Sequence, residues 1–188
     1  MNRASLICAL AGLCGILPLP ALAQGAPQTR STQALSMLDG KWSGPAWVIA
    51  PDGQRYDMQQ TETVCPAVFG QIRVMEGRGE ASGSTRFHAI TIFEGKPDGT
   101  IAMRSYTPGR TGEYALIPRA DGFEWRHEMS GQAVRYVIRI DGDVWHEVGE
   151  KRNAQGDGWE QIFGMRLVRQ TRKDEGCITP LDVEVAGR

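Results

Sequence analysis

Histidine is scarce in this chain of 188 residues, and the common catalytic motifs are absent. The three histidines are His88, His127 and His146, and neither of the two His-Glu pairs continues into the HExxH pattern that holds zinc from one face of a helix. The chain also lacks a Gly-x-Ser-x-Gly nucleophile motif, a phosphate-binding loop and a Cys-x-x-Cys pair. We therefore expect no catalytic residues, no cofactor and no metal, unless the three histidines converge from different strands.

Long hydrophobic runs are absent too, with one exception at the N-terminus. Residues 6–17 are apolar, follow Arg3 and precede an Ala-Leu-Ala sequence that ends at Ala23, which is the pattern of a secretory signal peptide with its cleavage site. This run of about a dozen residues is shorter than the ~20 of a spanning helix. The sequence thus predicts a signal peptide over residues 1–23, export to the periplasm and no integral membrane segment in the mature chain. An acylated lipoprotein anchored at Cys14 is the alternative, although the bulky leucine before that cysteine disfavours it.

Neither sign of charge is in excess. Without residues 1–23 the chain has 20 basic and 22 acidic side chains, which gives a formal charge of −2. Nucleic acids and anionic membrane surfaces attract proteins with an excess of positive charge, so we expect neither as the main partner. The remaining 165 residues fit one domain, in which a polar, flexible lead-in over residues 24–33 precedes a folded domain over residues 34–188.

Only two cysteines remain after removal of the signal peptide, Cys65 and Cys177. In an oxidising compartment an even number of cysteines favours a disulfide. Such a bond would join the C-terminal tail to the body of the domain. Two separate buried thiols are the alternative.

What the chain does contain is a regular succession of strand patterns. Apolar and polar residues alternate between turn signals such as Asp-Gly, Pro-Gly and Ser-Gly, and the connections are too short for crossover helices. A short helix over residues 32–38, with Thr32 as its candidate cap, precedes them. A glycine-rich turn is expected at residues 77–84. The ten expected strands are 41–50, 54–64, 68–76, 86–94, 99–107, 111–118, 122–129, 132–141, 143–150 and 158–169.

Ten consecutive antiparallel strands without a covering helix would leave two long sheet edges free to pair with other chains. Closing the sheet on itself removes both edges. The predicted fold class is therefore all-β, a single antiparallel meander β-barrel of about 8–10 strands.

A family resemblance begins at LDGKW, residues 38–42, which follows the short helical segment. It resembles the Gly-x-Trp signature of the lipocalin and fatty-acid-binding-protein superfamily, the calycins, and the whole domain resembles bacterial lipocalin-like domains. The resemblance implies that Trp42 closes one end of the barrel beneath a basic residue of the last strand, either Arg166 or Arg169. A disulfide from tail to barrel, as in many secreted lipocalins, also fits. The chain departs from lipocalins in strand number and in its C-terminal tail, and from fatty-acid-binding proteins in lacking a helical lid, so no ligand class carries over.

A barrel of this type can bind a ligand among its inward-facing side chains, or it can be filled by them. Arg104 and Tyr106 lie on one face of their strand and resemble the Arg-x-Tyr pair that grips a carboxylate in fatty-acid-binding proteins. Trp145 and Glu147 share a face, and His146 lies on the other. The candidate ligand-binding residues are aromatic or charged, namely Trp42, Arg104, Tyr106, Tyr114, Trp125, Arg126, Tyr136, Trp145 and Glu147.

The sequence predicts an exported, non-enzymatic protein that binds a small apolar or amphipathic molecule inside its barrel. One alternative is a structural or interaction module of the cell envelope whose barrel is packed shut. Another is a cofactor-independent isomerase or cyclase that uses Glu147 or His127 as a desolvated acid or base. Haem binding is disfavoured, because nitrobindin-like proteins hold haem through a histidine near the C-terminus and no histidine follows His146.

Overall fold

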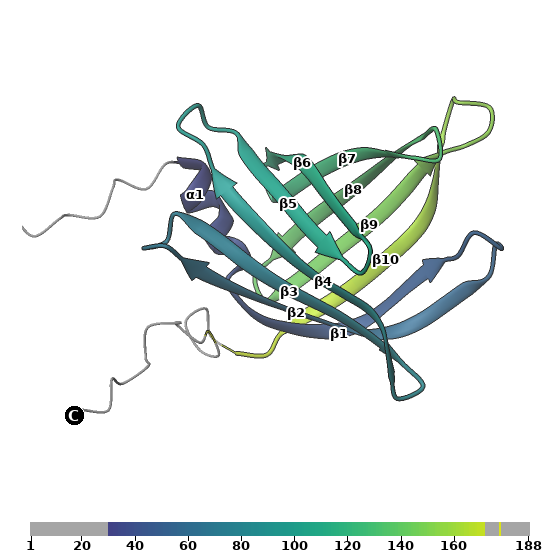
Figure 1. The fold of residues 1–188 in the computed structure, drawn as a ribbon, viewed down its shortest axis with the longest axis horizontal. Helices are drawn as coiled ribbons and strands as arrows, with labels where there is room; N and C mark the ends of the chain where they lie inside the picture. Colours follow the sequence, from purple (N-terminus) through teal and green to yellow (C-terminus); the bar gives the residue numbers. More distant parts are fainter. Residues whose placement is uncertain (1–29, 172–176, 178–188) are drawn as a thin grey trace, which may run out of the picture.

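Ten strands follow one another along the chain, and a short helix precedes them (Figure 1). The computed structural model describes residues 30–171 and residue 177, so the predicted signal peptide and its cleavage site lie outside the described residues. The elements are α1 (Arg30–Leu35), the 3-10 helix η1 (Ser36–Leu38), β1 (Gly40–Ile49), β2 (Arg55–Ala67), β3 (Ile72–Ala81), β4 (Ser84–Gly95), β5 (Ile101–Thr107), β6 (Arg110–Arg119), β7 (Gly122–Met129), β8 (Gln132–Asp141), β9 (Val144–Arg152) and β10 (Trp159–Arg169).

The strands form one closed antiparallel barrel. Each strand pairs with the next one in the sequence, and β1 closes the sheet by pairing with β10, where Trp42 lies opposite Arg169. The predicted fold class, a meander barrel without free edges, is confirmed, with ten strands. Because side chains alternate between the two faces of a strand, every second residue of each strand points into the barrel.

The hairpin turns lie largely where the sequence predicts them, except that residues 68–71, expected as the start of a strand, form the turn between β2 and β3. Gly53, Gly99, Gly109, Gly131 and Gly142 all have positive φ angles. Glycine adopts this conformation without steric cost, which is why Asp-Gly, Pro-Gly and Ser-Gly dipeptides suit tight connections between antiparallel strands.

The predicted turn over residues 77–84 is wrong. Strand β3 continues to Ala81, and the turn is confined to the two residues before β4. Two of the glycines serve packing instead of turning: a Cβ on Gly77 would lie 2.6 Å from Glu62 Oε2, and one on Gly79 would lie 2.6 Å from Met58 Sδ. These glycines leave room for longer side chains of the neighbouring strand β2, so they lie inside a strand.

The helix begins at Arg30, two residues earlier than predicted. Thr32 therefore lies inside it, buried against the barrel, and does not cap it. The contact with β4 is close, since a Cβ on Gly95 would lie 2.4 Å from Thr32 Oγ1, and the Ser31 hydroxyl donates to the Lys96 carbonyl at 3.3 Å. Within the described part of the chain, no helix combines the length and the apolar character needed to cross a membrane.

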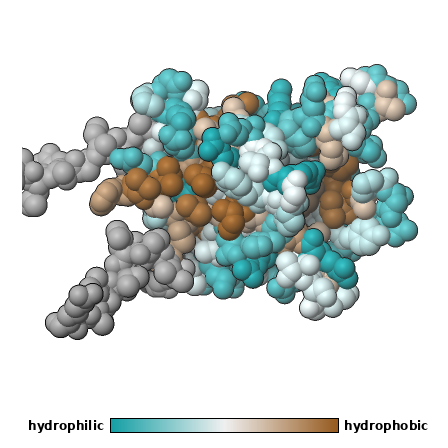
Figure 2. All heavy atoms as spheres, viewed as in Figure 1, coloured by the Kyte–Doolittle hydropathy of each residue, from teal (hydrophilic) through white to brown (hydrophobic). Residues whose placement is uncertain are grey.

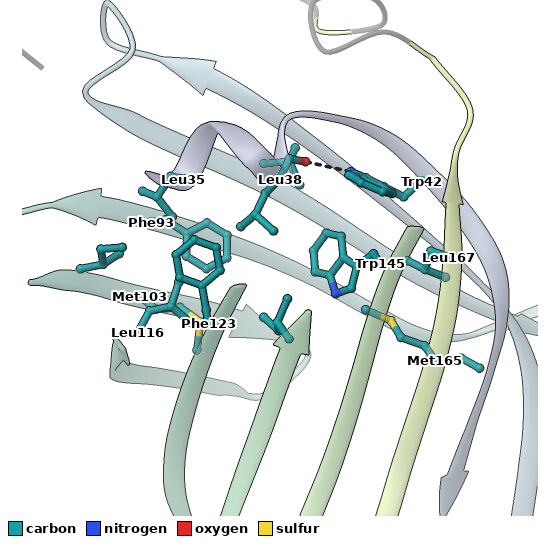
Figure 3. Packing of buried hydrophobic residues seen from close by; sticks show 14 residues of the cluster. Leu35, Leu38, Trp42, Phe93, Met103, Leu116, Phe123, Trp145, Met165 and Leu167 are labelled. Carbon is teal, nitrogen blue, oxygen red and sulfur yellow. Dashed lines mark hydrogen bonds between the residues drawn. The ribbon is translucent and has the colours of Figure 1, made fainter. Parts of the chain in front are cut away.

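Helices α1 and η1 close one end of the barrel, here called the closed end (Figure 1). Leu35 and Leu38 point from them into a cluster of buried side chains that includes Trp42, Phe123 and Trp145 (Figure 3). The two indole rings meet edge to face, with centroids 5.6 Å apart. The buried area of these large apolar side chains is a main source of the barrel's stability.

A disulfide and a buried ion pair link the segments around this end. Cys65 of β2 and Cys177 form a disulfide with 5.4 Å between their Cα atoms, as predicted. Asp39, between η1 and β1, accepts a hydrogen bond of 2.6 Å from Arg73 Nε of β3, and both side chains are buried. A buried ion pair of this kind fixes a geometry more than it adds net stability.

Candidate ligand-binding site

The closed end is sealed by the tryptophan of the Gly-x-Trp signature. Trp42 is fully buried, and its indole N–H donates to the Leu38 carbonyl at 2.8 Å (Figure 3). The Arg169 guanidinium lies over the ring, 3.8 Å from its centroid, and donates to the carbonyls of Met37 and Asp39. Of the two arginines that the resemblance implies, Arg169 therefore takes this position, and Arg166 is exposed.

The opposite end, here called the open end, is formed by the hairpin turns between β1 and β2, β3 and β4, β5 and β6, β7 and β8, and β9 and β10. Five inward-facing rings, here called the aromatic wall, lie toward it. Trp125 stacks on Tyr136 at 4.2 Å and on His127 at 5.3 Å between ring centroids. All five rings remain partly exposed although they face into a closed barrel. Solvent therefore reaches the interior from this end. The wall consists of Tyr114, Trp125, His127, Tyr136 and Phe163.

Glycines on neighbouring positions make room for these rings. A Cβ on Gly112 would lie 2.0 Å from the Tyr114 hydroxyl, and one on Gly149 would lie 2.6 Å from the ring of Tyr136. The rings of Tyr114 and Tyr136 therefore lie over glycines. Trp125, His127 and Tyr136 are stacked, whereas Tyr114 is tilted by 47° against Trp125 and Phe163 by 55° against Tyr136.

Apolar side chains continue from the wall to the rim of the open end. Tyr56, Phe87 and Met129 lie on inward-facing strand positions, and between 40% and 47% of their surface is exposed. Figure 2 shows apolar surface at both ends of the barrel in this view, separated by largely hydrophilic strand surfaces. Exposed apolar side chains beside an aromatic lining are typical of a ligand or partner site, although Val68 and Phe69 at the closed end are exposed as well.

Two carboxyl groups lie deeper inside, beneath the wall. Glu62 of β2 is 5% exposed and Glu147 of β9 is 9% exposed. The Gln60 amide donates to Glu62 Oε1 at 2.7 Å, whereas Glu62 Oε2 is buried without a hydrogen-bond partner among the described residues. Buried polar atoms are nearly always hydrogen-bonded, so this oxygen calls for a donor that the described chain does not supply.

Burial changes the acidity of both groups. Loss of water raises the pKa of Glu62 to about 8, against the lowering effect of the Gln60 hydrogen bond, and the charge of Glu147 raises it further. Burial likewise raises the pKa of Glu147 to about 7, and the indole groups of Trp145 and Trp125 oppose that rise. The two carboxyls are therefore close enough to influence one another, and both titrate near neutral pH.

The structure divides the predicted ligand-binding residues into two groups. Arg104, Tyr106 and Arg126 lie on outward-facing positions, where Arg104 pairs with Glu113 and Arg126 pairs with Glu124 at 2.6 Å. The other six lie on inward-facing positions, with two at the closed end, three in the aromatic wall and one beneath it. The inward-facing group is Trp42, Tyr114, Trp125, Tyr136, Trp145 and Glu147.

Sequence reasoning missed Glu62, Gln60 and Phe163. The first two lie in QQTET, where polar residues occupy both faces of the strand and alternation gives no inner side. One signal was available: Gly77 and Gly79 lie two positions apart on the neighbouring strand, and two missing side chains on one face leave space for large neighbours.

The three histidines do not come together. His88 is exposed on the outer surface and contacts Glu76 at 3.0 Å, and His146 is exposed on the outward face of β9. His127 alone faces inward. Across the described residues, no cluster of three His, Cys, Asp or Glu side chains has the arrangement of a metal site.

These features define the class of fold: a ten-stranded antiparallel meander barrel with one end sealed by a tryptophan and an arginine, and an aromatic lining toward the other. No family model matches the chain, and no curated protein matches it. Among solved structures, the crystal structure of Rv2717c from M. tuberculosis is similar, with a TM-score of 0.60 and 18% sequence identity over 77% of this chain and 100% of that chain. This likeness supports the barrel fold, and no family model confirms the resemblance to calycins.

Proposed function

We propose that this protein is an exported binding protein that holds a small apolar or amphipathic molecule inside its barrel. The observation that carries the proposal is the partly exposed aromatic wall on the inward face, open to solvent at the end opposite the Trp42 seal. Ligand sites are commonly apolar and aromatic hollows with a few polar groups. Glu62 and Glu147 supply such groups.

Export is supported by the predicted signal peptide and by the disulfide between Cys65 and Cys177. Disulfides form and persist in oxidising compartments such as the bacterial periplasm. A site that is sealed at one end and open at the other suits a carrier, because the ligand enters and leaves by one route without opening the core.

Native mass spectrometry of the mature protein, purified gently from the periplasm, tests this proposal. We expect a co-purifying small molecule near one-to-one stoichiometry, released on denaturation, and displacement of a fluorescent lipid probe. Trp125→Ala is expected to weaken probe binding about tenfold or more, because a stacked ring surface is lost. The matched control Tyr106→Ala, which removes an outward-facing ring, should leave binding unchanged. If no molecule co-purifies and no probe binds, a packed interaction module is the better description.

One observation favours a second function, that of an isomerase or cyclase without a cofactor. Glu147 is a buried acid beside Trp125 with a pKa of about 7, which suits proton transfer near neutral pH. Incubating the protein and its extracted ligand in D₂O distinguishes this function from simple binding. A catalyst would introduce deuterium at a carbon of the ligand and lose this ability in Glu147→Gln. Recovery of an unlabelled ligand would show that the protein binds the ligand without catalysing proton exchange.

A further inference from the structure

We infer that the ligand carries a cationic head group with N–H donors, of the amidinium, guanidinium or primary ammonium class, which Glu62 and Glu147 receive beneath the aromatic wall. The inference rests on the proposed function, since it names the chemical class that the same interior would select. Three features of the interior support it: an unsatisfied acceptor, the lack of a partner cation and the stacked rings above.

The acceptor is Glu62 Oε2, which is buried and has no hydrogen-bond partner in the described chain. The same carboxyl group lies against Gly77, where a Cβ would approach it to 2.6 Å, so its position is fixed by the sheet. An apolar ligand would leave this oxygen without a donor, which costs about 1–3 kcal/mol for a buried group. A ligand with N–H groups removes that cost.

No positively charged side chain among the described residues pairs with either carboxyl group. Neither Glu62 nor Glu147 forms an ion pair with a described residue, although ion pairs are numerous on the outer surface. Arg73 binds Asp39 at the closed end, and Lys151 lies near the open end, 3.4 Å from Glu160. When ionised, two acidic groups without a counter-ion repel an anionic ligand and attract a cationic one, and low polarity strengthens both effects.

The stacked rings fit the rest of such a ligand. Trp125 and Tyr136 stack face to face, with 4.2 Å between their centroids and 5° between their planes, and by strand position they lie between the open end and the carboxyls. A planar cation that contacts an uncovered face of these rings gains both apolar contact and cation–π attraction. Burial raises the pKa of Glu62 to about 8 and that of Glu147 to about 7, so that near neutral pH the Glu62 carboxyl holds a proton, which a cation would expel as it binds.

Other titratable side chains face the same interior and bear on any dependence on pH. Among them Tyr136 interacts with Glu147, since burial first and then the charge of Glu147 raise the Tyr136 pKa to about 12. By strand position these groups are Arg73 of β3, Arg110 and Tyr114 of β6, His127 of β7, Tyr136 of β8, Lys151 of β9, and Glu160 and Arg169 of β10.

An isosteric series tests the inference on the full mature protein. Naphthamidine, naphthamide and naphthoate have nearly the same shape and carry positive, zero and negative charge. Isothermal titration calorimetry should give the highest affinity for naphthamidine, with uptake of a released proton by the buffer, and the lowest for naphthoate. If naphthamide or naphthoate binds as tightly as naphthamidine, the inference is overturned and the proposed function stands. If none of the three binds, and no probe binds either, both fail.

Variants connect the preference to the two carboxyls. Glu62→Gln and Glu147→Gln should each weaken naphthamidine binding about tenfold or more and leave naphthamide binding nearly unchanged. Glu113→Gln, which removes an exposed outer carboxyl, is the matched control and should change neither. If Glu62→Gln does not fold, the pH dependence of the unaltered protein tests the inference. Its affinity for naphthamidine must fall as the pH drops from about 9 to about 6, because both carboxyls take up protons. A pH-independent affinity would contradict the inference.

Discussion

Glu62 holds a carboxyl group where the fold supplies one hydrogen bond and almost no water, and this has a consequence for stability. Its pKa rises from an ordinary 4.5 to about 8 on folding, so between these values the folded state binds more protons than the unfolded state. The free energy of unfolding must then fall as the pH rises through this window. Glu147 contributes a smaller change of the same sign.

We therefore predict that Glu62→Gln is more stable than the unaltered protein at about pH 8, by on the order of 2 kcal/mol, and nearly equal to it at about pH 5. Urea unfolding at a series of pH values measures the difference. The glutamine keeps the oxygen that accepts from Gln60 and carries no charge. Glu113→Gln on the outer surface should show no such trend. A variant that is less stable in alkali would mean that the Glu62 carboxylate is ionised and paired.

Arg169 combines several contacts in a single side chain that is 8% exposed. It stacks on Trp42, donates to the carbonyls of Met37 and Asp39, and pairs with Asp143 at 2.9 Å. Removing it takes away a donor from each of two carbonyl oxygens at the sealed end of the barrel.

We expect Arg169→Met to lower the free energy of unfolding by about 2–4 kcal/mol, because methionine keeps the apolar contact and loses the hydrogen bonds and the cation–π attraction. Urea unfolding measures the loss. Arg166→Met on the same strand, where the side chain is exposed, is the control and should change stability by less than about 0.5 kcal/mol. Equal effects of the two substitutions would show that the Arg169 contacts do not hold the closed end.

At the scale of elements, the connection between β2 and β3 is strained. Val68 and Phe69 have φ angles of 50° and 55°, a conformation that β-branched and bulky residues rarely adopt, and both are exposed. Asparagine tolerates this conformation.

Val68→Asn is therefore expected to stabilise the protein by about 1 kcal/mol, since the strain is relieved and little buried area is lost. Val168→Asn, at a partly exposed position within β10, is the matched control and should destabilise by up to about 1 kcal/mol, because valine favours strands. Thermal unfolding of both variants measures the two shifts. A lower melting temperature for Val68→Asn would indicate that the Val68 side chain makes a stabilising contact.

The strands were predictable because most turns use glycine for its positive φ. The pattern misled where a residue had another role. Gly77 and Gly79 lie within a strand to make room for β2 side chains, and the turn at Val68 carries no Asp-Gly or Pro-Gly signal. Sequence composition alone cannot separate a glycine needed for its backbone angle from one needed for its small size.

The interior was predictable only in part, for a related reason. Alternation groups residues by face, and apolar partners then reveal the inner one: Trp145 and Glu147 share their face and lie inside. On β5 both faces carry side chains that could contact a ligand. Met103 and Ser105 lie on the inward face, and Arg104 lies on the outward face. Only pairing with neighbouring strands, which depends on the whole barrel, fixes such a choice.

At the scale of the whole molecule, the barrel depends on contacts between segments that are far apart in the sequence. Strand β1 must pair with β10 to close the sheet, and the disulfide joins Cys65 to Cys177 across 112 residues. A cross-link over so long a segment lowers the entropy of the unfolded chain strongly. The sheet itself is closed by the pairing of β1 with β10, which does not include the disulfide.

The double variant Cys65→Ser, Cys177→Ser is accordingly expected to keep the barrel fold and to lose about 3–4 kcal/mol of unfolding free energy. Urea unfolding monitored by tryptophan fluorescence measures this loss, and far-ultraviolet circular dichroism checks that the strands persist. Reductant should destabilise the unaltered protein to the same level and have no effect on the double variant, which separates loss of the bond from the effect of serine. If the double variant is as stable as the unaltered protein, the disulfide does not stabilise the barrel by restricting the unfolded chain, and the prediction is wrong.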